Sequence, residues 1–118
     1  MVGETIPLIQ VPDILATIRW YEALGFKLVQ HKEVNGIVNT ASLKMGASEL
    51  TLRSGGKETT APRREVDLFL NCRSIDKLFE KLKDKVEIIE KPRENIFGVR
   101  EFVICDYNHF WITFSEGI

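Results

Sequence analysis

The sequence predicts an α+β fold built from two copies of one unit, in which a strand is followed by a helix and then by three strands. Three observations support this prediction. Apolar and polar residues alternate over several short segments, as they do in half-buried strands. In two other segments apolar residues recur at three- and four-residue spacing, as they do in amphipathic helices. The order of these segments repeats after about sixty residues, which indicates two similar modules with pseudo-symmetry.

Length and composition limit the kind of protein this can be. Of the 118 residues, 44% are apolar, which is enough for the core of one domain. We place a first module at about 4–54, a linker at 55–64 and a second module at about 65–118. The 16 basic and 17 acidic residues balance, so nothing favours nucleic acid as a partner. No apolar run reaches the roughly eighteen residues needed to span a membrane, and a small molecule is therefore the expected ligand.

The chain start and the cysteines bear on the compartment. Residues 1–4 lack the basic segment that opens a signal peptide, so we expect a cytoplasmic protein. Cys72 and Cys105 lie far apart, each inside an apolar segment typical of a strand. This placement predicts buried, reduced thiols rather than a disulfide or a metal-binding pair.

In the first module, residues 6–11 are predicted to form a strand that ends at Pro12. Asp13 is expected to cap a helix that stops at Gly25. The apolar face of this helix is predicted to consist of Ile14, Ile18, Tyr21 and Leu24, with Trp20 also in the core.

Three strands complete that module. Residues 26–34 are predicted to be the first of them, and Asn35-Gly36 then suits a tight hairpin turn because both residues tolerate positive φ. The second strand returns through about Met45, and the alternation of residues 49–53 predicts the third.

The linker is polar and rich in Gly, Thr and Pro, and after it the pattern begins again. We predict a strand at 66–72 and then a helix capped by Ser74. A strand at 86–89 should end before residues 92–95, because Pro92 interrupts it. The closing strands are predicted at 98–105 and 110–116.

Motifs at both ends of the chain resemble those of one family. Val11-Pro12-Asp13, Trp20-Tyr21 and Leu24-Gly25-Phe26 resemble the opening motif of the vicinal oxygen chelate superfamily, also called the glyoxalase, bleomycin resistance protein and dioxygenase superfamily. Arg100-Glu101-Phe102 and Asp106-x-Asn108 are similar to its closing motif. The resemblance implies two βαβββ modules related by pseudo-two-fold symmetry, whose curved mixed sheets enclose a cleft.

The resemblance also identifies four positions where enzymes of this family place metal ligands. In this sequence they hold Ile6, Glu49, Asp67 and Thr113. The family enzymes use imidazole and carboxylate ligands, which suit a divalent transition metal. Because an aliphatic side chain and a hydroxyl replace two of them, we expect no metal and no other cofactor.

The implied function is that of the bleomycin resistance proteins, which sequester a drug without transforming it and so give antibiotic resistance. The alternative is a glyoxalase-like lyase or isomerase, or another metal-dependent enzyme of the family. Such an enzyme would use Glu49 or Asp67 as a base or in a weak metal site.

Side chains alternate across a strand, so these positions also identify their neighbours on the same face. Trp111 should lie beside Thr113, Arg53 on the face of Glu49, and Phe69 on the face of Asp67. Phe97 occupies a loop position where bleomycin-binding relatives often carry tryptophan. The expected ligand-binding residues are therefore Trp111, Glu49, Asp67, Phe69, Phe97, Thr113 and Arg53. Aromatic rings with a few polar groups suit a drug-sized ligand that is planar or cationic.

Other interpretations of these residues stay open. Trp111 and Phe69 could fill a closed core or a dimer interface. Glu49 and Asp67 could be solvated, could pair with Arg53 and Arg100, or could face each other, which would raise the pKa of one carboxyl group. Family members of this size commonly pair, with the cleft completed at or near the interface, so the resemblance implies a homodimer.

Overall fold

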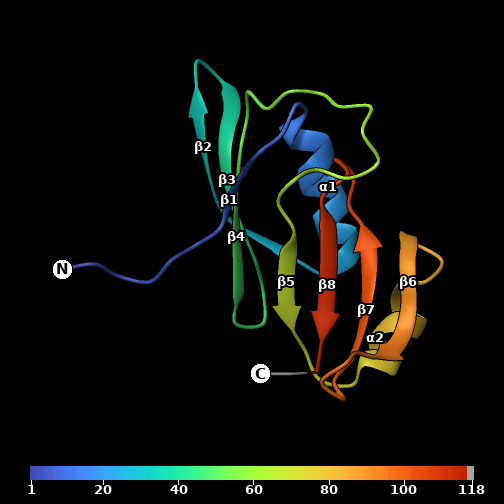
Figure 1. The fold of residues 1–118 in the computed structure, drawn as a ribbon. Coiled ribbons are helices and arrows are strands. Elements are labelled where there is room, and N and C mark those ends of the chain that lie inside the picture. Colours follow the sequence, from blue (N-terminus) through green and yellow to red (C-terminus); the bar gives the residue numbers. More distant parts are fainter. Residues whose placement is uncertain (117–118) are drawn as a thin grey trace. The chain divides into compact units, whose positions relative to one another are not determined.

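The computed structural model describes residues 1–116, which form two compact units. The first is Met1–Glu58 and the second begins at Thr59. Each unit consists of a strand, a helix and three further strands, in that order (Figure 1). The predicted α+β fold with two βαβββ modules is therefore confirmed.

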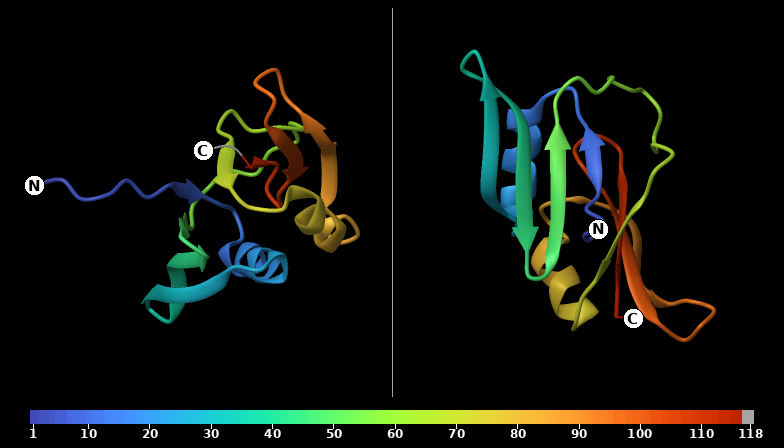
Figure 2. Two further views of the ribbon diagram at one scale, coloured as in Figure 1. Left: turned by 90° about the horizontal axis from the view of Figure 1, so that it is seen from below. Right: turned by 90° about the vertical axis from the view of Figure 1, so that its left-hand side faces the viewer.

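The first unit contains a mixed four-stranded sheet with one helix on it (Figure 2). Its elements are β1 (Leu8–Gln10), α1 (Ile14–Leu24), β2 (Lys27–Val34), β3 (Ile37–Met45) and β4 (Ser48–Arg53). The strand order is β1-β4-β3-β2, in which β1 runs parallel to β4 and the other neighbours are antiparallel. The helix packs against β3 and β2.

Local interactions of the predicted kind hold α1. The Asp13 Oδ1 atom accepts a hydrogen bond from the Ala16 N–H at 3.0 Å, which confirms the predicted cap. Gly25 adopts φ 123°, and its N–H donates to the carbonyls of Tyr21 and Glu22. The predicted apolar face is buried. Trp20, by contrast, is half-buried and packs edge-on against Tyr21.

The second unit repeats this architecture. Its elements are β5 (Leu68–Asn71), α2 (Ile75–Leu82), β6 (Glu87–Glu94), β7 (Arg100–Cys105) and β8 (Trp111–Ser115). The strand order is β5-β8-β7-β6, with β5 parallel to β8. The helix packs against β6 and β7. Phe102 stacks on Phe114 with ring centroids 5.1 Å apart, and Phe79 of α2 meets Phe102 edge-on, so this face of the sheet carries the core.

Two details of the second unit contradict the sequence predictions. Ser74 makes no capping hydrogen bond, and the Glu116 Oε1 atom instead accepts from the Ile75 N–H at 2.8 Å. Strand β6 continues through Pro92 to Glu94 instead of ending at residue 89. A proline is tolerated there because β6 lies at the edge of the sheet and has one neighbouring strand.

The remaining strand predictions were correct in position, with ends that differ from the observed ones by one or two residues. Strand β1 begins at Leu8 rather than at residue 6, and β5 covers Leu68–Asn71 rather than 66–72. Neither helix within residues 1–116 is long and apolar enough to cross a membrane.

Candidate functional site

The face of the second sheet opposite α2 carries most of the predicted ligand-binding residues. We call it the open face. Ile112 and Phe114 of β8 are buried on the helix side, so the alternating Trp111 and Thr113 lie on the open face. The strand register places Phe69 of β5 directly beside Thr113. Phe69 is 62% exposed, so it does not fill the core of its own unit.

An arginine covers the ring of Trp111. The guanidinium carbon of Arg63 lies 4.1 Å from the centroid of the Trp111 ring. The Arg63 Nε atom donates to Asp67 Oδ1 at 3.2 Å, and the Arg63 Nη2 atom donates to Asp67 Oδ2. The partner of Asp67 is thus Arg63, whereas Arg100 pairs with Asp76, so the suggested pairing of Asp67 with Arg53 or Arg100 is wrong.

The hydrogen bond to Asp67 raises the pKa of Arg63 above its usual value, with partial burial opposing this effect. The negative charge of Glu90 adds to the increase. Arg63 therefore remains a full positive charge on the open face.

The segment around Arg63 is fixed to the turn between β7 and β8. The Trp111 Nε1–H donates to the Pro62 carbonyl at 3.3 Å, and the Arg64 N–H donates to the His109 carbonyl at 2.9 Å. The Arg64 guanidinium also donates to the Asn108 carbonyl at 2.7 Å. The end of the predicted linker is therefore part of the second unit's structure.

A buried aspartate shapes the turn to which that segment is tied. The Asp106 Oδ1 atom accepts hydrogen bonds from the N–H groups of Asn108 and Phe110 at 2.7 and 2.8 Å. His109 adopts φ 69° at the tip, a conformation that histidine tolerates better than most residues do. This turn determines where β8, and hence Trp111, begins.

The other edge of the open face is charged. In the strand register, Glu90 of β6 lies opposite Val103, and Arg93 lies opposite Glu101 of β7. The Arg93 guanidinium donates to Glu90 at 2.8 Å, and its Nη2 atom lies 3.8 Å from a Glu101 oxygen. On this side the aromatic residues of the open face are therefore bordered by acidic and basic side chains that pair with one another.

Phe97 lies on an ordered turn between β6 and β7. The Asn95 Oδ1 atom accepts hydrogen bonds from the N–H groups of Phe97 and Val99 at 2.8 and 3.1 Å. The Phe97 side chain is 81% exposed. The turn therefore presents an apolar ring to solvent.

The remaining predicted residues belong to the first unit. Glu49 and Arg53 lie on β4, on the side opposite the buried Leu50 and Leu52. Glu49 is half-buried and Arg53 is exposed. Ile6 precedes β1 and is partly exposed.

The side chains at the four positions where family enzymes place metal ligands do not fit a metal ion. Ile6 offers no donor atom, Thr113 offers a neutral hydroxyl, and Asp67 is engaged by Arg63. In the described part of the chain, no group of three or more His, Cys, Asp or Glu side chains is arranged to hold a metal ion.

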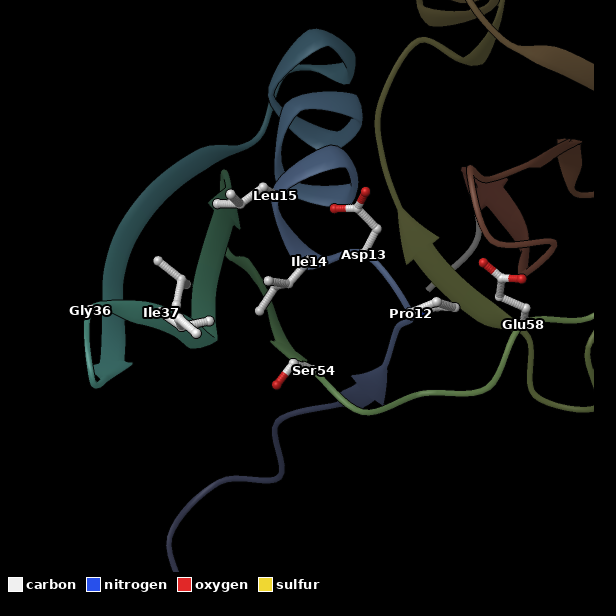
Figure 3. Close-up of a pocket in the computed structure, with 9 residues that line it drawn as sticks. Pro12, Asp13, Ile14, Leu15, Gly36, Ile37, Ser54 and Glu58 are labelled. Carbon is white, nitrogen blue, oxygen red and sulfur yellow. The ribbon is translucent and has the colours of Figure 1, made fainter.

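The first unit also has a shallow pocket of about 600 Å³ between the start of α1 and the β2–β3 turn (Figure 3). Ile14, Leu15 and Ile37 contribute apolar surface, and Asp13 and Glu58 contribute carboxylates. None of the predicted ligand-binding residues lines it. Asp13 and Ile14 already serve the fold as cap and core, so the open face is the better candidate site.

Sequence reasoning missed Arg63, although it contacts both Trp111 and Asp67. Four-residue spacing predicts an ion pair on a helix, but residues 63–67 are not helical, so the sequence carried no signal for this pair. The missing information was the path of the linker, which brings Arg63 over β8.

Comparisons with known proteins agree on the fold. The bleomycin resistance determinant encoded on the transposon Tn5 superposes with a TM-score of 0.79 at 15% identity, with 98% of each chain covered. The bleomycin-binding protein of Streptomyces verticillus, solved with copper(II)-bleomycin, gives 0.76 at 19% identity with 100% of both chains covered. TioX from Micromonospora sp. ML1 gives 0.76 at 15% identity, covering 98% of this chain and 100% of TioX.

At these identities the structures establish the fold alone. A comparison with curated proteins gives no match. The model of the Glyoxalase/Bleomycin resistance protein/Dioxygenase superfamily matches residues 5–114. The chain therefore belongs to that superfamily.

Proposed function

We propose that this protein binds and sequesters a small drug-like molecule without transforming it. The observation that carries the proposal is the pair of aromatic side chains, Trp111 and Phe69, on the face of the second sheet opposite α2. Aromatic surface with a few placed polar groups is typical of sites for partly planar ligands. Thr113 and Asp67 supply those polar groups, and Phe97, Glu49 and Arg53 are further candidates.

Two neighbouring structures contain bleomycin, which makes a drug of that kind a reasonable first ligand to test. The net charge of this chain is only −1, so long-range attraction of a cationic drug would be modest. We therefore propose the ligand class and not bleomycin itself. The protein would act in the cytoplasm as a homodimer and would protect the cell from the drug.

The test is ligand binding followed by tryptophan fluorescence and equilibrium dialysis across a panel of planar drugs, with and without positive charge. Trp111→Ala should weaken binding of a panel member at least about tenfold, because the stacking surface is lost. Trp20→Phe should bind normally, because Trp20 packs against Tyr21 in the other unit. Chromatography should recover the bound drug unchanged. If Trp111→Ala and wild type bound the panel drugs with equal affinity, the open face would not be the binding site.

The alternative is an enzyme that uses Glu49, whose half-buried carboxylate has no hydrogen bond or ion pair among residues 1–116. Turnover of a glutathione hemithioacetal that is lost with chelator and in Glu49→Gln would favour that alternative. Wild-type protein without turnover would favour sequestration.

A further inference from the structure

The planar cation on the ring of Trp111 comes from the chain itself. The Arg63 guanidinium lies over the ring, and both oxygens of Asp67 accept hydrogen bonds from it. A ring face combined with a carboxylate that accepts two parallel hydrogen bonds is the arrangement that guanidinium and amidinium groups bind best. The position of Arg63 therefore indicates that the Trp111 ring and the Asp67 carboxylate together complement a guanidinium or amidinium group.

The contact of Arg63 with Trp111 and Asp67 is exposed enough for another cation to replace the Arg63 guanidinium. The side chains of Arg63 and Asp67 are 48% and 40% exposed. Ion pairs and cation–π contacts at such exposed positions contribute little to stability. Because Asp67 is itself accessible, the departure of Arg63 would not leave a buried carboxylate without a partner. Another planar cation can take its place at small cost.

The backbone on both sides of Arg63 keeps it near this place. The Pro62 carbonyl accepts from Trp111, and the Arg64 N–H donates to His109. Since both neighbours are anchored, the Arg63 side chain is present at a high effective concentration. A ligand from solution must compete with it.

We propose that Trp111 and Asp67 form a subsite for an amidinium or guanidinium group of a small ligand, and that Arg63 fills this subsite until the ligand displaces it. This inference rests on the proposed function of the open face. The neighbouring Phe69 and Thr113 would contact the rest of the ligand.

The test uses benzamidine as the cationic probe and benzamide as its neutral isostere. Fluorescence is followed in a Trp20→Phe background, where Trp111 is the single tryptophan. Arg63→Ala should bind benzamidine about tenfold more tightly, because the internal competitor is gone. Benzamide affinity should not change. Asp67→Asn added to Arg63→Ala should cancel the gain.

Arg73→Ala is the matched control. Arg73 is exposed and makes no hydrogen bond or ion pair within residues 1–116, so its loss should leave benzamidine affinity unchanged. Arg63→Gln, which keeps most of the side-chain length without the charge, should also bind benzamidine more tightly and guards against a folding defect of the alanine variant.

Three results would overturn the inference: no benzamidine binding to any variant, unchanged or weaker binding to both Arg63 variants, or an equal gain for benzamide. These results are separable from failure of the proposed function. If panel drugs bind through Trp111 while benzamidine binds wild type and the Arg63 variants with equal affinity, the inference alone fails. If no panel drug binds, the proposed function fails, whatever benzamidine does.

Discussion

At the residue scale, α2 is capped by a side chain far away in the sequence. Ser74 adopts φ 58° and makes no capping hydrogen bond, whereas Glu116 accepts from the Ile75 N–H at 2.8 Å. Glu116→Ala should therefore lower the free energy of unfolding by about 1 kcal/mol, as the loss of a helix cap does. Ser74→Ala should stay within about 0.5 kcal/mol of wild type. Urea denaturation measures both, and a larger cost for Ser74→Ala would contradict this assignment.

The ion pair between Asp76 and Arg100 predicts an acid-dependent stability. The Arg100 guanidinium donates to both Asp76 oxygens at 2.8 and 2.7 Å. This bonding lowers the pKa of Asp76 from its ordinary value of 3.8, with desolvation opposing it. Because the pKa is lower in the folded than in the unfolded protein, the stabilisation is present above pH 3.8 and is lost as the pH falls through the folded pKa.

Asp76→Asn should therefore reduce the fall in the urea midpoint between about pH 5 and pH 2. The effect should be small, because the pair is exposed to solvent. Asp84→Asn removes an exposed carboxylate that has no hydrogen bond in the described structure, and it serves as the control. Parallel pH profiles of wild type and Asp76→Asn would show that the ion pair does not stabilise the fold.

At the element scale, the sequence predicted those features whose determinants are close together in the chain. Asp13 caps α1 through a residue three positions on, and Asn35-Gly36 adopts φ 53° and 80° as a hairpin turn requires. Alternation likewise placed Trp111, Thr113 and Phe69 on one face. For these elements local chemistry was sufficient.

Features that depend on distant partners were not predictable in this way. The cap of α2 comes from beyond β8, and Pro92 is tolerated because topology places β6 at an edge. Arg63 reaches Trp111 only because the preceding segment folds back over the β7–β8 turn. Each of these required the tertiary path of the chain.

One glycine determines how the segment after β4 meets β1. A Cβ atom at Gly56 would lie 2.5 Å from backbone atoms of Gln10 and Val11, and the Gly56 N–H donates to the Val11 carbonyl. Gly56→Ala must therefore push the two segments apart and should cost about 1–3 kcal/mol in urea denaturation. Gly3→Ala has no atom within 4 Å of the added methyl and should be neutral. Equal stability of the two variants would mean that this close approach is not maintained.

At the scale of the whole molecule, the two cysteines report how readily the second unit opens. Both are free thiols; Cys105 is buried and Cys72 is half-buried, so the prediction of burial is fully met only for Cys105. Burial raises the pKa of Cys105 to about 11, with Glu87 and Asp106 adding to the shift. At pH 8 Cys105 should therefore react with a thiol reagent only when its unit unfolds.

Cys72→Ser isolates the Cys105 signal in this experiment, and Cys105→Ser isolates the signal of Cys72. The rate for Cys105 should follow the opening of the unit and rise steeply with urea, whereas Cys72 should react sooner in the native protein. Rapid labelling of Cys105 without urea would show that β7 is far more open than its burial indicates.

A turn of the second unit holds two large apolar side chains on its surface. Ile96 and Phe97 lie on a turn ordered by Asn95, and both side chains are more than four-fifths exposed. Large apolar side chains that adjoin one another on an exposed, hydrogen-bonded turn are typical of a surface that a partner covers. We expect sedimentation equilibrium to give about twice the 13.5 kDa chain mass, which is a homodimer. Phe97→Ser should shift the equilibrium toward monomer, whereas Tyr107→Ser, at another exposed turn, should not. A monomer at every concentration, or equal effects of the two variants, would show that the Ile96–Phe97 turn is not part of a subunit interface.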